Sequence, residues 1–277
     1  MSSIRTVPEK FGLLPDTRVT GAVVPAAMPT RLGLVIPTLR EAANISEAVE
    51  RAVRSLDSLG ISYELIVVDD DSGDGAEFLV KKLATRGWPV RFLSRVGERG
   101  LGSAVLYGWR HSDADVLGVM DADLQHPPEL LPALWKAVEA GSDIALASRY
   151  VHAGSLGQWH FVRHLLSRAA IALTWPLQRH QIYVQDPMSG FFLVRRSSIQ
   201  EVPLQTKGFK LLLEILVRGK ITSAKEVPFA FGSRRAGTSK AGLKVGLDYV
   251  QTLGRLWKQR RQRASHAEIY SDPGQSA

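Results

Sequence analysis

The sequence predicts an α/β protein built on a mostly parallel, doubly wound sheet. Short apolar runs alternate with amphipathic stretches of helical periodicity, and this alternation occurs five times between residues 32 and 150. Such a pattern is typical of strands joined by crossover helices that cover both faces of one sheet. The 277 residues, 45% of them hydrophobic, are enough for one large domain of this class.

The predicted strands and helices follow one another in order from residue 32. Asn44 with Glu47 resembles a capping box at the start of the first helix, and Gly60 is a typical C-terminal stop. Pro127 and Pro128 suit the first turn of a later helix. We predict strands at 32–37, 63–70, 90–95, 114–123 and 142–150, and helices at 44–60, 75–87, 100–112 and 127–141. An apolar stripe along the first helix is formed by Ile45, Val49, Val53 and Leu56.

The chain after residue 150 departs from this alternation. We predict an amphipathic helix at 159–178, a strand that turns into a helix at 190–199, a short buried helix at 208–219 and a strand at 221–231. The predicted organisation is a flexible tail at 1–30, a folded domain at 31–240, an amphipathic basic helix at 241–265 and a disordered tail at 266–277.

Composition restricts the partners and the compartment. The net charge of +8 and the pI of about 9.8 favour anionic partners such as phosphates, nucleic acid or an acidic membrane surface. The absence of cysteine excludes disulfides and cysteine metal sites. No apolar run reaches the ~18 residues expected of a membrane span, and the N-terminus lacks a signal-peptide layout. We therefore expect a cytoplasmic protein that lies peripherally on the cytoplasmic face of a membrane.

Acidic side chains follow several of the predicted strands. Glu41 comes after the first strand, Asp69–Asp71 after the second, and Asp121 with Asp123 after the fourth. Ligands of open parallel sheets bind at the carboxyl ends of the strands, where these groups converge. Mg²⁺ or Mn²⁺ prefers such oxygen ligands and completes its coordination with substrate phosphates. An isolated Asp-x-Asp is usually a solvated turn, but the preceding strand and the second acidic strand end favour a metal and nucleotide diphosphate site.

Not every acidic residue in these loops is expected to bind a ligand. The stretch DDDSGDG at 69–75 also has the composition of a turn with Asx and glycine chemistry. Asp71 and Asp74 stand directly before a predicted helix, where either of them could act as a cap. We therefore leave both out of the predicted ligand set.

Seven motifs together resemble family 2 glycosyltransferases, and most closely the dolichol-phosphate mannosyltransferase branch. The resemblance extends from Leu32 to Leu243. It is most specific in the combination of DADLQH with the later Arg…Gly-x-Ser-Lys string. In chain order the motifs are VIPTLREAANI, ELIVVDDDSGDG, RGLGSAVLYGW, VMDADLQHPPE, ASRY, QDPMSGFFLVRR and RRAGTSKAGL.

The resemblance implies a GT-A fold that transfers a sugar, with inversion, from a nucleotide sugar to a polyprenyl or dolichyl phosphate. GDP-mannose is the leading donor, and the cofactor is Mg²⁺ or Mn²⁺. The implied metal ligands are Asp121, Asp123 and Gln125. The implied nucleotide-sugar site comprises Pro37, Leu39, Glu41, Val68, Asp70, Asp121, Ala122, Asp123, Arg149, Arg234 and Lys240, of which Asp123 and Arg234 count as catalytic.

The lipid acceptor would be held by Arg163 and Ser167. These residues are four apart and share one face if the segment is helical. The residues alone favour a core helix, whereas the resemblance favours an interfacial helix with Arg163 and Ser167 on the lipid phosphate as catalytic groups. Because that phosphate is already anionic, no general base is required. His126 is expected to orient a neighbour, and Asp186 is a further candidate near the acceptor or sugar.

Departures from the family pattern leave the donor and the anchor open. Leu39 replaces the tyrosine that is common there, so aromatic packing on the nucleoside is lost. Many relatives carry C-terminal membrane spans; here we expect the anchor to be the 161–176 helix, the basic terminal helix or a separate membrane protein.

Two other classes of function are compatible with parts of the sequence. A polyprenyl-phosphate glucosyltransferase, or a family 2 enzyme acting on a hydroxyl with a general base, is the main alternative. A nucleic-acid-binding protein is disfavoured, because the cations lie in loops and at the chain end rather than interleaved with aromatic residues on one face.

Overall fold

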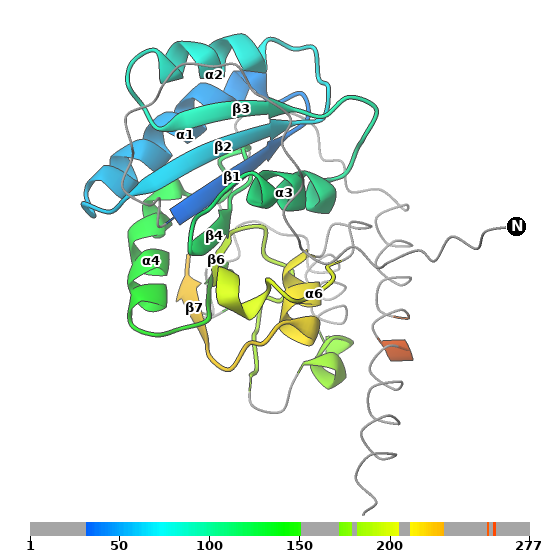
Figure 1. The fold of residues 1–277 in the computed structure, drawn as a ribbon. Coiled ribbons are helices and arrows are strands. Elements are labelled where there is room, and N and C mark those ends of the chain that lie inside the picture. The colour runs from blue at the N-terminus through cyan, green and yellow to red at the C-terminus, as the bar shows by residue number, and fades with distance from the viewer. Residues whose placement is uncertain are drawn as a thin grey trace, which may run out of the picture.

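The structure is a computed structural model, and it describes residues 32–150, 172–178, 182–204 and 211–229 together with residues 254, 257 and 258. Within these residues a seven-stranded sheet has helices on both faces (Figure 1). The strands are β1 (Leu32–Thr38), β2 (Tyr63–Asp69), β3 (Val90–Ser94), β4 (Val116–Val119), β5 (Ile144–Ser148), β6 (Phe192–Arg195) and β7 (Ala224–Pro228). The α-helices are α1 (Ala42–Asp57), α2 (Ala76–Ala84), α3 (Leu101–Arg110), α4 (Leu131–Glu139) and α6 (Leu211–Arg218). Three 3₁₀ turns are η1 (Pro128–Leu130), η2 (Trp175–Leu177) and η3 (Arg196–Ser198).

The strand order is β3-β2-β1-β4-β6-β5-β7. The pairs β2–β3, β1–β2, β1–β4 and β5–β7 are parallel, whereas β6 is antiparallel to both of its neighbours. The predicted, mostly parallel α/β sheet is therefore confirmed. Simple strand–helix alternation missed the insertion of β6 between β4 and β5. The chain leaves β5 at the carboxyl edge of the sheet and re-enters from that same edge, so β6 has to run in the opposite direction.

Each face of the sheet has its own hydrophobic core. On one face the β1 side chains Leu32, Leu34 and Ile36 pack with α1, α2 and α4. On the other, Val35 and Val68 pack with α3 and α6, where Trp109 is the largest buried side chain. Burial of the predicted α1 stripe is confirmed for Ile45, Val49, Val53 and Leu56. Strands that are apolar on both faces explain the nearly continuous hydrophobic runs in the sequence.

The start of α1 differs from the prediction. The helix begins at Ala42 with Glu41 as its N-cap residue, so the capping box of Asn44 with Glu47 is wrong. Instead, the Glu41 carbonyl accepts the Asn44 N–H at 2.9 Å, and the Glu41 carboxylate accepts the Asn44 side-chain amide at 2.9 Å. The Ala42 N–H donates to Asp74 at 2.9 Å, across the loop after β2. A residue distant in sequence therefore replaces the local cap.

The other end of α1 agrees with the prediction. Helix α1 ends at Asp57, and Gly60 follows with a positive φ of 64°. None of the helices in the described parts of the chain is long and apolar enough to cross a membrane.

Candidate active site

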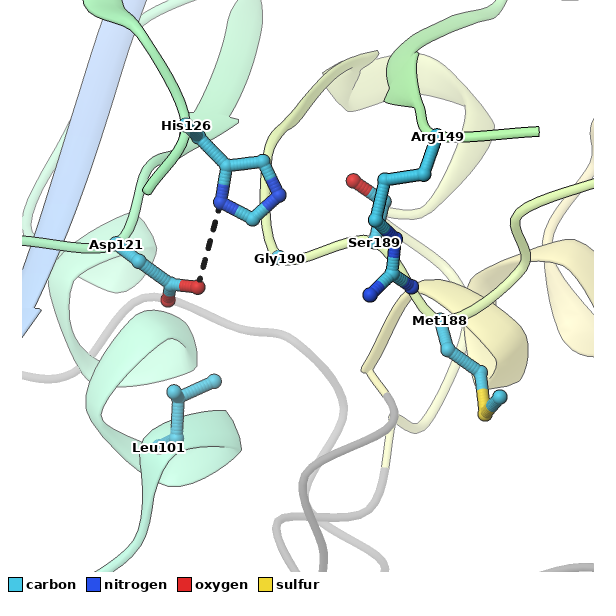
Figure 2. Close-up of a pocket in the computed structure, with 7 residues that line it drawn as sticks. All are labelled: Leu101, Asp121, His126, Arg149, Met188, Ser189 and Gly190. Carbon is cyan, nitrogen blue, oxygen red and sulfur yellow. Dashed lines mark ion pairs between the residues drawn. The ribbon is translucent and has the colours of Figure 1, made fainter. Parts of the chain in front are cut away.

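A pocket of about 220 Å³ opens at the carboxyl edge of the sheet (Figure 2). Four segments meet there: the start of α3, the loop after β4, the end of β5 and the loop that precedes β6. The pocket is lined by Leu101, Asp121, His126, Arg149, Met188, Ser189 and Gly190. Three of these seven residues come from the motifs predicted to bind the metal and the sugar diphosphate.

Asp121 and Asp123 occupy different environments although one residue separates them. The Asp121 side chain is 28% exposed and lines the pocket. Asp123 is buried, and its Oδ1 accepts the Gln125 N–H at 3.1 Å. Leu124 between Asp123 and Gln125 has a φ of 59°, so the chain turns sharply at this point. The turn allows the strand end to present one open and one enclosed carboxylate.

Gly190 provides the space for the open carboxylate. A Cβ atom at Gly190 would lie 2.4 Å from Asp121 Oδ2, closer than any normal contact. The loop before β6 therefore approaches the Asp121 carboxylate as closely as a backbone can. Any larger residue at position 190 would have to displace that carboxylate.

The residues present fit a divalent ion that also binds substrate phosphate. In the described part of the chain, no group of three or more His, Cys, Asp or Glu side chains is arranged to hold a metal alone. Asp121 faces the pocket, whereas Asp123 is buried and Gln125 is half-buried on the turn that follows. Mg²⁺ and Mn²⁺ sites in phosphate-transferring enzymes use one or two carboxylates and leave the other positions to the substrate. The donor set matches that type of site.

His126 is neutral in this environment. Burial, followed by the nearby positive charge of Arg149, lowers the pKa of His126 to about 4. Its ring packs between Phe229, at a centroid distance of 5.1 Å, and Phe191, at 6.0 Å. Its Nδ1 lies 3.8 Å from Asp121 Oδ2, the contact dashed in Figure 2. With the imidazole uncharged at neutral pH, this contact is not an ion pair there, and an orienting role for His126 stays a prediction.

Arg149 forms the opposite wall of the pocket. Its Nε and Nη2 donate to the two oxygens of Asp186, each at 2.8 Å, and its backbone N–H donates to Asp186 Oδ2 at 3.2 Å. Asp186 is fully buried. Desolvation lowers the pKa of Arg149, but the hydrogen bonds and the negative charge of Asp186 outweigh it and leave the pKa raised. Arg149 is therefore a fixed positive charge, and Asp186 orients it.

The predicted nucleoside side contains a buried ion pair that sequence reasoning missed. Asp70 accepts hydrogen bonds from Arg95 Nε at 2.8 Å, from Arg95 Nη2 and from the Gly100 N–H at 2.8 Å. Arg95 is 3% exposed and also donates to Ser103 at 3.0 Å. The pair joins β2, β3 and the start of α3. The available signal in the sequence was Arg95 itself, a charged residue at the end of a predicted strand and two residues before Gly97. Its partner Asp70 could not be identified, because it is 25 residues away in the chain.

The remaining predicted nucleoside residues lie along the ends of β1 and β2. Pro37 pairs with Val68 in the sheet, and Leu39 and Glu41 follow in the connection to α1. Val68 is fully buried, with its side chain packed on the face of the sheet that α3 covers, so its contact with a nucleoside stays a prediction. Ala122 is buried between the two aspartates. The structure thus brings Asp121, Arg149 and His126 together at the pocket and places Asp70 in the buried ion pair.

Four predicted site residues lie outside the described residues: Arg163, Ser167, Arg234 and Lys240. The same is true of most of the 161–176 segment and of nearly all of the predicted terminal helix. Their roles at the lipid phosphate and the diphosphate remain predictions.

Comparison with known proteins defines the class. Residues 34–203 match the family model for glycosyl transferase family 2. A dolichol-phosphate mannosyltransferase from Pyrococcus furiosus is 42% identical over 231 residues, which cover 82% of this chain and 64% of that protein. Proteins of the same name from Mycosarcoma maydis and Saccharomyces cerevisiae are 37% and 35% identical, and the matches cover 81% and 83% of this chain and 78% and 88% of theirs. The chain is therefore a member of glycosyl transferase family 2.

The fold has solved counterparts. Glucosyl-3-phosphoglycerate synthase from Mycobacterium tuberculosis, crystallised with Mn²⁺, UDP-glucose and phosphoglyceric acid, superimposes with a TM-score of 0.60. The sequences are 19% identical, and the match covers 83% of this chain and 79% of the other. At this identity the likeness establishes the shared GT-A fold, as the sequence predicted.

Proposed function

We propose that this glycosyltransferase moves mannose from GDP-mannose to a dolichyl or other polyprenyl phosphate, with inversion at the anomeric carbon. The observation that carries the proposal is a carboxylate, Asp121, and a fixed cation, Arg149, facing one pocket at the carboxyl edge of the sheet. This arrangement suits a sugar diphosphate bound partly through a cation and partly through a guanidinium. The sequence identity of 35–42% to dolichol-phosphate mannosyltransferases supports the choice of donor and acceptor.

Residues in the pocket and on the turn after β4 would contribute to sugar transfer in different ways. Asp121, Asp123 and Gln125 would hold Mg²⁺ or Mn²⁺, which when bound supplies positive charge against the departing diphosphate. Arg149 adds a second positive charge from the opposite wall, and Asp186 keeps its guanidinium oriented. Charge complementarity of this kind stabilises the leaving group without any change in protonation.

The acceptor requires no general base. A lipid phosphate is anionic at neutral pH, so its oxygen can attack without losing a proton in the transition state. His126 is not required as a base in this scheme, and its ring is buried against Phe229 and Phe191. We further propose that Arg163 and Ser167 hold the lipid phosphate, and that Arg234 and Lys240 contact the diphosphate.

The proposed reaction places the protein at a membrane surface. Polyprenyl phosphates reside in membranes, and the positive net charge of +8 favours contact with acidic headgroups. We propose peripheral attachment on the cytoplasmic face, through the 161–176 segment, the basic terminal segment or a separate anchor protein.

The direct test is a donor panel. The protein would be incubated with a polyprenyl phosphate, Mg²⁺ or Mn²⁺, and either GDP-mannose, UDP-glucose or another nucleotide sugar, and the glycolipid would be identified by mass. We expect a mannosyl lipid from GDP-mannose, with an anomeric configuration opposite to that of the donor. A glucosyl lipid would change the donor, and transfer only to a hydroxyl acceptor would overturn the proposed acceptor.

Substitution of Asp123 tests the metal role. We expect Asp123→Ala to abolish transfer, because a ligand of the metal is lost. Asp123→Asn is the sharper variant, since its amide oxygen can still accept the Gln125 N–H and preserve the turn. It should also lose at least about a hundredfold in turnover and bind Mn²⁺ more weakly in a calorimetric titration with GDP. Near-normal turnover in both variants would contradict the role.

A further inference from the structure

A glutamate outside the pocket holds the loop that carries Asp186. Glu226 lies in the middle of β7, and its two carboxylate oxygens accept two consecutive backbone N–H groups. Oε2 accepts the Gln185 N–H at 2.9 Å, and Oε1 accepts the Asp186 N–H at 3.1 Å. One side chain thus fixes two successive peptide groups 40 residues earlier in the chain.

These two N–H groups donate to Glu226 rather than to a carbonyl of their own loop. Gln185 and Asp186 are followed by Pro187, which disfavours helical geometry at Asp186 and lacks an N–H of its own. The Asp186 side chain is fully buried, and an unsatisfied N–H beside it would be costly. A carboxylate that accepts both N–H groups gives charge-assisted hydrogen bonds, which are stronger than neutral ones.

The strand that carries Glu226 is itself aligned with the strand that leads to Arg149. In the parallel pairing of β5 with β7, Glu226 is opposite Leu146 and Pro228 is opposite Ser148. The Phe229 N–H then donates to the Ser148 carbonyl at 3.2 Å, directly before Arg149. Glu226 and Arg149 therefore belong to one paired unit of the sheet. Two contacts attach the 185–186 loop to this unit. Glu226 accepts hydrogen bonds from the loop backbone, and Arg149 donates hydrogen bonds to the Asp186 side chain.

We propose that Glu226 is a positioning residue for sugar transfer, acting through the Gln185–Asp186 backbone on the carboxylate that orients Arg149. This inference rests on the proposed function for the catalytic role of Arg149. Asp186 accepts three hydrogen bonds from Arg149, so a shift of the Asp186 backbone moves the guanidinium in the pocket wall. Glu226 itself touches neither substrate nor metal in this account.

Three single variants separate this role from a general loss of fold. Glu226→Ala removes both acceptors and should lower kcat/KM about tenfold or more, because small displacements of positioning groups have effects of that size. Glu226→Gln keeps one acceptor oxygen and should retain intermediate activity. Lys225→Ala is the matched control: Lys225 is the exposed neighbour on the same strand, with its side chain on the opposite face. It should stay within about twofold of the parent, since no positioning contact is removed.

A double-mutant cycle tests whether Glu226 acts through Asp186. Asp186→Asn should lower activity, and adding Glu226→Ala should then have little further effect, because the second variant acts on a group already disabled. Two independent losses that multiply would overturn the proposal. Equal activity of Glu226→Ala and Lys225→Ala, at equal thermal midpoints, would also overturn it.

A readout without turnover distinguishes failure of this inference from failure of the proposed function. Residue-resolved hydrogen exchange should show faster exchange at Gln185, Asp186 and Arg149 in Glu226→Ala, but not in Lys225→Ala. The Arg149 amide is decisive, since its N–H donates to Asp186 rather than to Glu226. If the parent protein transferred no sugar from any donor, the proposed function would fail, while this exchange pattern would still establish the Glu226 contact. Unchanged exchange at Arg149 would refute the positioning link whatever the substrate.

Discussion

Gly190 and Asp121 illustrate how much the pocket depends on single residues. The glycine is in an ordinary backbone conformation, so its role is to leave space rather than to allow a special turn. That space is filled by the Asp121 carboxylate, which also approaches the neutral ring of His126. Glycine often occurs at functional sites because it lets the backbone come close to a functional side chain or a ligand.

We predict that Gly190→Ala impairs transfer while leaving the protein folded. The added Cβ would meet Asp121 Oδ2 at 2.4 Å, and the end of this short side chain can turn away at small cost. Turnover should fall about tenfold or more because the carboxylate is misplaced. The measurement is kcat at saturating donor together with the thermal midpoint. Normal turnover in a folded variant would show that Asp121 does not act from the position seen here.

At the scale of elements, the two edges of the sheet are built differently. The carboxyl edge keeps Asp121 exposed enough to meet a ligand, while the amino edge is closed by side-chain hydrogen bonds. Arg196 donates to the carbonyls of Ala114 at 2.7 Å and Ser112 at 2.6 Å, beyond the end of α3. Asp143, before β5, accepts the Thr222 N–H at 2.7 Å and the Ser223 N–H at 3.0 Å, before β7. The closed edge stabilises the sheet so that the open edge can hold the pocket.

We predict that Asp143 contributes stability that depends on pH. Desolvation raises its pKa, but the hydrogen bonds from Thr222 and Ser223 outweigh this, so the net pKa is below the usual 3.8. A carboxyl group with a lowered folded-state pKa stabilises the fold above its unfolded pKa and loses that contribution as the pH falls through the folded value. Because Asp143 is partly exposed to solvent, which screens its charge, Asp143→Asn should lower the free energy of unfolding at pH 7 by only about 1 kcal/mol.

The difference between the parent and Asp143→Asn should shrink below pH 3.8. Denaturant unfolding at pH 7 and at several acidic pH values measures it. Asp74→Asn, at the opposite edge of the sheet, serves as a comparison for loss of an N-terminal helix contact. A pH-independent difference for Asp143→Asn would contradict the charge-based explanation.

For the whole molecule, the excess of positive charge is the property most relevant to the proposed lipid substrate. The segment RLWKQRRQR at 255–263 contains five cations and no acid. Each basic residue close to an acidic membrane contributes about 1 kcal/mol of binding free energy at moderate salt. If the acceptor is the proposed lipid phosphate, this segment would strengthen binding to the membrane that contains it.

We predict that Lys258→Gln with Arg260→Gln weakens binding to vesicles containing acidic lipid by about thirtyfold at 0.1 M salt, which corresponds to about 1 kcal/mol for each lost cation. The matched control removes two exposed cations elsewhere, Lys82 and Arg86, at and just beyond the end of α2. Co-sedimentation at low and high salt measures the effect. Equal losses from both pairs would indicate a response to net charge alone, and no loss from either would contradict a role for the terminal cations.

Sequence and structure contributed differently to the fold. Apolar runs separated by amphipathic stretches identified β1 to β5 and the helices between them, because burial on both faces of a strand and on one face of a helix leaves a local periodic signal. The position and direction of β6 left no such signal, since neighbours in a sheet are chosen by contacts distant in sequence. The α1 cap was mispredicted for the same reason: its acceptor, Asp74, is 32 residues from Ala42.

The site shows the same division. The sequence by itself determined which chemical groups are available: the two carboxylates of Asp121 and Asp123 at a strand end and the arginine of the ASRY motif, Arg149. Its motifs were also similar enough to a known family to indicate a glycosyltransferase. Only the tertiary structure decided which groups come into contact. It forms the ion pairs of Arg149 with Asp186 and of Arg95 with Asp70. It also places Gly190 against the Asp121 carboxylate. It also set the charge of His126, whose pKa falls through burial and the approach of Arg149. Residue types and local periodicity can be read directly from the sequence. Burial, electrostatic environment and hydrogen-bond partners arise only when distant segments of the chain pack together.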